Sequence, residues 1–217
     1  GKWVAVGEHT DITKCVAYST DNGSTWSYYG FSLLTIAKSV IHNGLKWLIG
    51  GYTENAYKPI ILSSDGINWA YTPSNPTNLI MANSISVDDS TIIAVVGRGT
   101  HHYNYVCYRS TDNGNSWQSS GNVFGSHYEN IESIQYINNV WHATGSSINY
   151  DYAYNTTIHG VWSGRKRLFK NACYSISNDK YGNLYAFGSD DSINTSIKRS
   201  TDKGYNWSPI TLTGVLA

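Results

Sequence analysis

Aromatic and amide side chains gather in three short segments of the chain, and their types suit a neutral, polar ligand. The aromatic members are Tyr52, Tyr57, His101, His102, Tyr103, Tyr105, Tyr150, Tyr152 and Tyr154, with asparagines between them at Asn55, Asn104, Asn149 and Asn155. A sugar presents apolar C–H faces beside hydroxyl groups, so its sites combine aromatic rings with amide hydrogen bonds. These segments therefore predict a carbohydrate site. The alternative is that the tyrosines are strand residues packed between sheets, since alternation puts Tyr150, Tyr152 and Tyr154 on one face.

Carboxylates near the same segments are candidates for the catalytic acids of glycoside hydrolysis. The candidates are Glu8, Asp11, Glu54, Glu129, Glu132, Asp151, Asp190 and Asp191. The reaction usually needs two carboxyl groups about 5 to 10 Å apart. Glu132 alone falls near the start of an expected innermost strand, which makes it the one catalytic candidate. A lone acid does not constitute a mechanism, so a glycosidase is the alternative function and a non-catalytic binding protein the preferred one.

Other classes of site and partner find little support in the composition. His101 and His102 have no third ligand at a regular spacing, so we predict no metal and no cofactor. Three widely spaced cysteines, Cys15, Cys107 and Cys173, are expected to be small core residues. Lysine and arginine (15) balance aspartate and glutamate (15), which argues against a nucleic-acid partner. No apolar run reaches the roughly 18 residues of a membrane helix, so no membrane insertion is predicted.

Two landmarks repeat in phase along the chain and indicate how these residues are positioned. A tryptophan recurs roughly every 45 residues, at Trp26, Trp69, Trp117, Trp162 and Trp207. An apolar run ending in glycine recurs at a similar interval, at Gly7, Gly51, Gly97, Gly145 and Gly188. Between the landmarks, short β-rich runs alternate with turn residues and no helical period is evident. Four-stranded sheets repeating at this interval predict an all-β, five-bladed β-propeller of antiparallel blades.

The tryptophans close a pattern of the form Ser-x-Asp-x-Gly-x-x-Trp. It runs from Ser19 to Trp26, from Ser110 to Trp117 and from Ser200 to Trp207, with a copy shortened by one residue from Ser63 to Trp69. This pattern resembles the Asp-box, or BNR repeat, of sialidases and of many non-enzymatic propellers. Its structural residues are expected to be Asp21, Gly23, Trp26, Asp65, Gly66, Trp69, Asp112, Gly114, Trp117, Asp202, Gly204 and Trp207. We expect each Asp and Gly to form a tight hairpin between the third and fourth strands of a blade.

The resemblance implies a ligand site on the face opposite the Asp-box turns, formed by the loops between second and third strands and between successive blades. A sialidase would also need three arginines for the sugar carboxylate. The chain has five arginines, of which Arg109 and Arg199 directly precede an Asp-box, and the family's Arg-Ile-Pro motif is absent. The catalytic set of a sialidase is therefore not expected, and the size is similar to that of five-bladed propeller lectins.

The repeats divide residues 1–217, as a single domain, into blades near 1–34, 35–79, 80–128, 129–170 and 171–217. Residues 1–7 correspond to the second strand of a blade, so the first blade lacks its innermost strand. Residues 213–217 could supply it and close the ring. An open strand edge also invites a partner segment or an oligomer there.

Three functions follow for testing. The first is a lectin-like propeller that binds a glycan or glycoconjugate. The second is a glycoside hydrolase or degenerate sialidase. The third is a structural or protein-interaction module of a larger surface or viral assembly.

Overall fold

The computed structural model describes residues 1–30, 33–54, 58–89, 93–99, 105–125, 129–158, 162–191 and 195–211. Within these ranges the chain forms nineteen β-strands and one 3-10 turn, η1 (Ile12–Lys14). None of the described helical segments is long and apolar enough to span a membrane. Several sequence predictions lie outside the described residues, namely those for Tyr57, His101, His102, Tyr103 and the closing segment 213–217, as do the side chains of Tyr105 and Glu129.

The strands form five antiparallel units that follow one another along the chain. The first unit has three strands, β1 (Trp3–Val6), β2 (Val16–Ser19) and β3 (Ser27–Tyr28). The second and third units contain β4 (Ile36–His42), β5 (Trp47–Tyr52), β6 (Ile60–Ser63) and β7 (Ala70–Tyr71), then β8 (Leu79–Val87), β9 (Ile93–Gly99), β10 (Tyr105–Ser110) and β11 (Gln118–Ser119). The last two contain β12 (Glu129–Ile137), β13 (Val140–Ser147), β14 (Tyr152–Asn155) and β15 (Ser163–Lys166), then β16 (Ala172–Asn178), β17 (Leu184–Ser189), β18 (Thr195–Ser200) and β19 (Ser208–Ile210).

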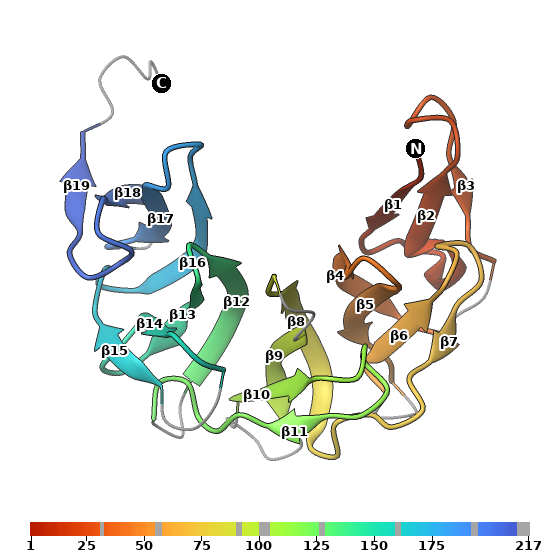
Figure 1. Cartoon of the computed structure of the whole chain (residues 1–217), viewed down its shortest axis with the longest axis horizontal. Coiled ribbons are helices and arrows are strands. Elements are labelled where there is room, and N and C mark those ends of the chain that lie inside the picture. Colours follow the sequence, from red (N-terminus) through yellow and green to blue (C-terminus); the bar gives the residue numbers. More distant parts are fainter. Residues whose placement is uncertain are drawn as a thin grey trace.

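The units stand side by side around an arc, with β4, β8, β12 and β16 on its inner side and β7, β11, β15 and β19 on its outer side (Figure 1). A single residue pair, Tyr52 with Met81, joins the second and third units into one continuous sheet. The all-β propeller class predicted from the repeats is confirmed. The arc is open in Figure 1, with the first and fifth units at its two ends, whereas the repeats predicted a closed disc. The number of blades in a closed ring therefore stays a prediction.

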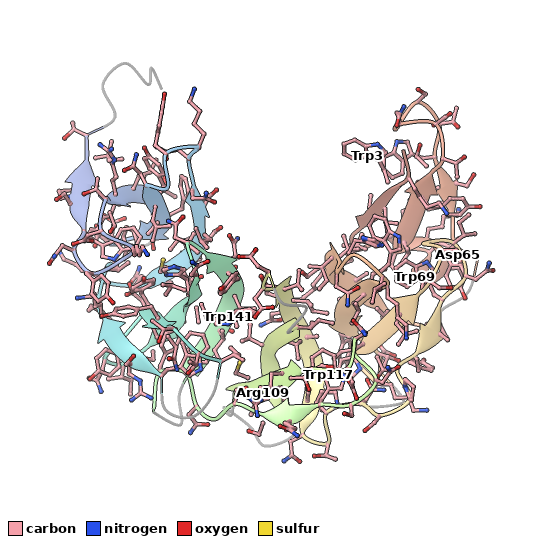
Figure 2. All side chains as sticks on the ribbon, viewed as in Figure 1. Trp3, Asp65, Trp69, Arg109, Trp117 and Trp141 are labelled. Atoms are coloured by element: carbon pink, nitrogen blue, oxygen red, sulfur yellow. The ribbon has the colours of Figure 1, made fainter. Side chains whose placement is uncertain are left out.

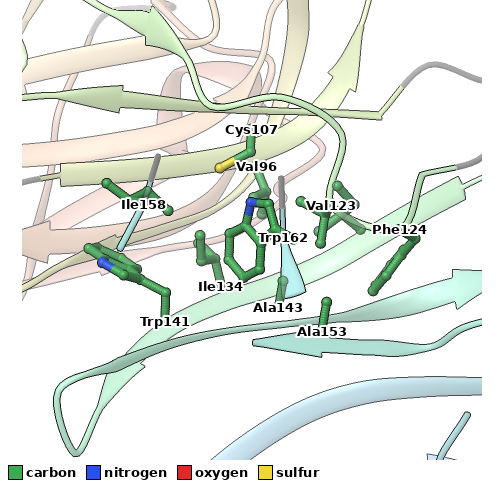
Figure 3. Close-up of a cluster of buried hydrophobic side chains, with 11 residues drawn as sticks. Val96, Cys107, Val123, Phe124, Ile134, Trp141, Ala143, Ala153, Ile158 and Trp162 are labelled. Atoms are coloured by element: carbon green, nitrogen blue, oxygen red, sulfur yellow. The ribbon is translucent and has the colours of Figure 1, made fainter. Parts of the chain in front are cut away.

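An apolar cluster fills each of the four junctions between successive units. Figure 3 shows the cluster between the third and fourth units, where Val96, Cys107 and Phe124 meet Trp141 and Trp162. These side chains are at most 2% exposed. Burial of one large apolar side chain stabilises a fold by roughly 1.5 to 3 kcal/mol. Each unit is therefore held mainly by its neighbours, as expected of a repeat protein.

The Ser-x-Asp turns tie the third and fourth strands of each complete repeat together. At Asp112 the carboxylate accepts hydrogen bonds from the backbone N–H of Ser116 (2.8 Å) and from the hydroxyl of Ser110 (2.8 Å). The Ser110 hydroxyl oxygen in turn accepts from the N–H of Gly114 (2.9 Å), whose φ is +80°. Asp21, Asp65 and Asp202 make equivalent bonds. Hydrogen bonds from Thr25 lower the pKa of Asp21 to about 2, so this turn holds an ionised carboxylate across the ordinary pH range.

Candidate ligand-binding site

The landmark glycines mark a bulge in the innermost strand of each four-stranded unit. Each of these glycines pairs with the last inner-strand residue before the register shifts. The pairs are Gly51 with Ala37, Gly97 with Ala82, Gly145 with Ile131, and Gly188 with Cys173. A Cβ atom on Gly145 would lie 1.8 Å from the carbonyl oxygen of Asn130, and the other three glycines meet a backbone carbonyl oxygen at 2.4 Å or less. Only glycine permits this close approach, and the inner strand takes up an extra residue there.

The extra residues differ in chemistry from unit to unit. They are Lys38 in β4, Asn83 in β8, Glu132 in β12 and Tyr174 in β16. Lys38 is exposed, Asn83 and Glu132 are half-buried, and the Tyr174 side chain is 49% exposed. Because these strands line the inner side of the arc (Figure 1), the bulges place an ammonium, an amide, a carboxylate and a phenol at equivalent positions on the inner strands. We call these four residues the bulge row.

Three members of the bulge row make hydrogen bonds to residues beside the row. The amide of Asn83 donates to the carbonyl oxygen of Ile131, the residue just before Glu132 (2.8 Å). The Glu132 carboxylate accepts from the side-chain amide of Asn130. The phenol oxygen of Tyr174 lies 3.2 Å from the hydroxyl of Ser189. The row therefore contains both hydrogen-bond donors and acceptors, and Asn83, Glu132 and Tyr174 are each held by a partner.

A serine follows every bulge residue, and two of these serines hold the adjacent unit. Ser39 accepts a hydrogen bond from the backbone N–H of Ile85 (3.1 Å). Ser84 accepts from the N–H of Ile134 (3.2 Å) and donates to its carbonyl oxygen (3.3 Å). These bonds fix the inner strands of successive units relative to one another, so the bulge row sits on a rigid support.

The predicted tyrosines divide between strand ends and the packed junction of the fourth and fifth units. Tyr52 ends β5 and is half-buried, as is Tyr150. Tyr152 is fully buried, and its hydroxyl lies 2.7 Å from Nδ1 of His142. Burial raises the pKa of the Tyr152 phenol. A buried ring cannot face a ligand, so Tyr152 packs between sheets, which is the alternative weighed from the sequence.

Tyr154 is also drawn into that junction. It is half-buried, and its ring meets the ring of Tyr205 edge-on at 5.1 Å between centroids. The Tyr152 ring makes a similar contact with Trp207, at 5.3 Å. The aromatic run of this unit therefore contributes chiefly to packing, since the half-buried Tyr150 also packs against the cluster between the third and fourth units.

The described carboxylates are mostly engaged in backbone hydrogen bonds. Asp151 is fully buried and accepts from the N–H groups of Leu168 and Phe169, both at 2.6 Å. Desolvation raises its pKa. Asp190 accepts from the N–H of Lys170 (3.0 Å) and the hydroxyl of Ser196 (3.1 Å). These two carboxylates fasten loops, and no hydrogen bond in the described part of the chain links Glu132 to a second carboxyl group.

Two arginines at the end of β15, Arg165 and Arg167, are likewise committed to the fold. Arg165 donates to the carbonyl oxygen of Val123 (2.8 Å), and Arg167 donates to that of Ser147 (2.6 Å). A guanidinium bound in this way lacks free donors in the forked geometry needed to clamp a carboxylate. Across the residues that the structure describes, no three His, Cys, Asp or Glu side chains lie close enough to hold a metal ion.

A concave feature lies on the side of the Ser-x-Asp turns, at the other end of the strands. It is a polar hollow of about 500 Å³ lined by Asn138, Asn139, Tyr181, Gly182, Thr201 and Lys203. Tyr181 is 77% exposed, and Asn138 donates to the carbonyl oxygen of Gly182 (2.8 Å). None of these residues is among the ligand-binding residues that the sequence predicts.

Sequence reasoning found Glu132 but missed Lys38, Asn83 and Tyr174. A signal for them exists, because each bulge residue is followed by serine: Lys38-Ser39, Asn83-Ser84, Glu132-Ser133 and Tyr174-Ser175. This short pattern precedes each landmark glycine from Gly51 to Gly188. Taken together, the serine and the glycine could have predicted the position of the bulge in each inner strand.

Comparison with known proteins supports the fold. No family model and no curated protein matches the sequence. Among solved structures, YCF48 bound to D1 peptide aligns over 94% of this chain with a TM-score of 0.63 and 18% identity. An ancestral GH74 enzyme aligns over 97% (TM-score 0.70, 17% identity), and the GH74 enzyme of Niastella koreensis over 98% (TM-score 0.69, 12% identity).

The chain spans 61% of the length of that YCF48 chain and 30% and 36% of the two GH74 chains. At these identities the similarity shows a shared propeller fold. It carries no information on ligands, which must be argued from the bulge row itself.

Proposed function

We propose that this protein is a non-catalytic, lectin-like propeller of the Asp-box type that binds carbohydrate along the bulge row. The observation that carries the proposal is the presence of four chemically different side chains at equivalent bulges on the inner strands. A phenol together with amide, carboxylate and ammonium groups on the inner strands would suit the mixed apolar and hydroxyl surface of a sugar.

Binding without hydrolysis is favoured by how the acids and arginines are used. Glu132 takes its hydrogen bond from Asn130, while Asp151 and Asp190 hold backbone N–H groups. Inverting and retaining glycosidases both need a second carboxyl group across the scissile bond. Repetition of the row across units would let weak contacts act together on an extended glycan.

The experiment is a glycan array screened with the full chain, followed by titration calorimetry with the best ligand. Tyr174→Ala and Glu132→Gln should each weaken binding about tenfold, equivalent to ~1.4 kcal/mol. Tyr181→Ala is the matched control, because it removes an exposed tyrosine of the same unit on the Asp-box side. It should bind like wild type.

Other outcomes would contradict the proposal in distinguishable ways. Loss of binding in Tyr181→Ala alone would move the site to the polar hollow. Turnover of a fluorogenic sialoside or arabinoside that disappears in Glu132→Gln would indicate a glycosidase. An array without any bound glycan would favour a protein-interaction module.

A further inference from the structure

The polar hollow on the side of the Ser-x-Asp turns has the features of a separate binding site. It lies between the fourth and fifth units and has a volume of about 500 Å³. We propose that it binds an acidic sugar, a hexuronate whose carboxylate pairs with the ammonium of Lys203. The proposal concerns a site distinct from the bulge row, and it does not depend on the proposed function.

Three turns from two units form the walls of the hollow. The lining residues come in pairs, from the β12–β13 turn (Asn138, Asn139), the β16–β17 turn (Tyr181, Gly182) and the β18–β19 turn (Thr201, Lys203). The Asn138 amide donates to the carbonyl oxygen of Gly182 (2.8 Å), which ties the first two turns together. Asp179 accepts from the N–H of Tyr181 (2.9 Å) and so fixes the second turn. A ligand would therefore meet a largely preformed surface.

The corresponding corner between the second and third units is bridged by side chains. There the amide of Asn43 donates to the side-chain oxygen of Asn113 (2.9 Å), and the ammonium of Lys46 donates to that of Asn115 (3.4 Å). Figure 2 shows Trp117, the tryptophan that ends this Ser-x-Asp turn, at the same junction. The turn of the third unit is thereby joined to the β4–β5 turn of the second.

The corner between the fourth and fifth units differs at both positions of the first of these bonds. Lys203 has the place of Asn113 in its turn, and the two residues have nearly equal φ angles, +59° and +58°. Ile137 has the place of Asn43, because each follows the inner-strand residue that pairs with the tryptophan of the next strand. Ile137 belongs to the apolar cluster of this junction and is 7% exposed. Its alkyl side chain cannot bond to Lys203.

The charges around the hollow favour an anion. No carboxylate among the described residues forms an ion pair with Lys203 or with Lys180, whose ammonium lies 5.0 Å from the centre of the Tyr181 ring. The acids of the same two turns, Asp179 and Asp202, use both side-chain oxygens to accept hydrogen bonds within their own turns. Two ammonium groups are thus left for a ligand, and a carboxylate is a strong partner for them.

The rest of the lining fits the hydroxyl groups and the apolar face of a sugar ring. The Tyr181 side chain is 77% exposed and offers its ring, while Asn139 and Thr201 add an amide and a hydroxyl. Ligand pockets have volumes of about 300 to 1,000 Å³, so a hollow of about 500 Å³ has room for a sugar ring. An inorganic anion would leave the ring and the amide unused, which is why we favour a hydroxylated carboxylate.

The test is an NMR titration of the isotope-labelled full chain with sodium glucuronate, and with glucose as its neutral counterpart. Glucuronate should shift the backbone amide signals of Asn139, Gly182 and Thr201. Glucose should bind about fivefold more weakly, because it lacks the carboxylate. Lys203→Asn should weaken glucuronate binding by about the same factor. Asparagine is the residue at the equivalent position of the third unit, with nearly the same φ, so the turn should keep its conformation.

Two further variants separate this site from the bulge row and from general effects of charge. Tyr181→Ala should also weaken glucuronate binding, whereas a neutral glycan on the bulge row should stay bound to the same variant. The two proposals therefore fail separately. Lys46→Asn is the matched control, because it removes a lysine at the corresponding corner whose ammonium already has a partner in Asn115. It should bind glucuronate like wild type.

Four results would overturn the proposal. Glucuronate could leave the three amide signals unmoved. Glucose could shift them with the same affinity, which would remove the role of the carboxylate. Sodium acetate could match glucuronate, which would indicate a general anion site. Lys46→Asn could weaken glucuronate binding as much as Lys203→Asn does, which would indicate an effect of net charge alone.

Discussion

Acidification should destabilise this protein through the buried side chain of His142, at the junction of the fourth and fifth units. His142 is fully buried, and burial lowers its pKa from 6.5 to about 4. The unfolded chain therefore takes up a proton near pH 6.5, while the folded chain resists protonation until about pH 4. Stability from this residue is complete above pH 6.5 and falls as the pH drops through that window. At 1.36 kcal/mol per pKa unit, the loss approaches ~3 kcal/mol by about pH 4.

The assay is urea unfolding followed by tryptophan fluorescence at several pH values, for the wild type and for His142→Gln. The variant will be less stable at neutral pH, because it loses the contact with Tyr152. Its stability should nevertheless fall less on acidification, by about 3 kcal/mol between pH 7 and pH 4. Protonation of Asp151 changes the free energy of unfolding in the opposite sense, because its raised pKa lets the folded form bind a proton first. Asp151 is present in both proteins, so its contribution cancels in the comparison. Equal losses in the two proteins would refute the reasoning.

The remaining predictions concern packing, loop fastening and thiol reactivity. Gly145→Ala should cost about 2 kcal/mol or more in urea unfolding, since its Cβ would lie 1.8 Å from the carbonyl oxygen of Asn130; an unchanged midpoint would contradict the bulge geometry. Asp151→Ala should cost about 2 to 4 kcal/mol because two buried N–H groups lose their acceptor, and Asp151→Asn should cost less by the same measurement. Burial raises the pKa of Cys107 to about 12, so Cys15, Cys107 and Cys173 should resist a thiol reagent in the native protein and react once it is denatured. Rapid native labelling at Cys107 would count against its placement in the core.

The repeat was readable from the sequence because its signals are local. Each Ser-x-Asp turn closes through bonds between residues at most four apart, such as Asp112 to Ser116, so its spacing is written directly in the chain. The landmark glycines follow from contact with the adjacent strand of the same hairpin. Both features depend on near neighbours, and together they were enough to predict an all-β propeller.

The ligand-facing residues were less accessible to sequence reasoning. Tyr152 and Tyr174 are both tyrosines in β-rich runs, yet one is fully buried against Trp207 and the other is 49% exposed at a bulge. The difference arises from register, because one extra residue in β16 changes which side chains face the neighbouring unit. A strand pattern with a period of two does not reveal such a shift.

The sequence by itself determined the unit of construction: a hairpin closed by aspartate, an apolar strand ending in glycine, and their recurrence along the chain. The tertiary structure decided which side chains are buried and which are exposed, as the bulge row on the inner strands and the exposed Trp3 and Phe187 show. The physical reason is that burial in a repeat protein is set by the neighbouring unit. Identical strand positions are therefore core residues in the middle of the arc and exposed surface at its ends.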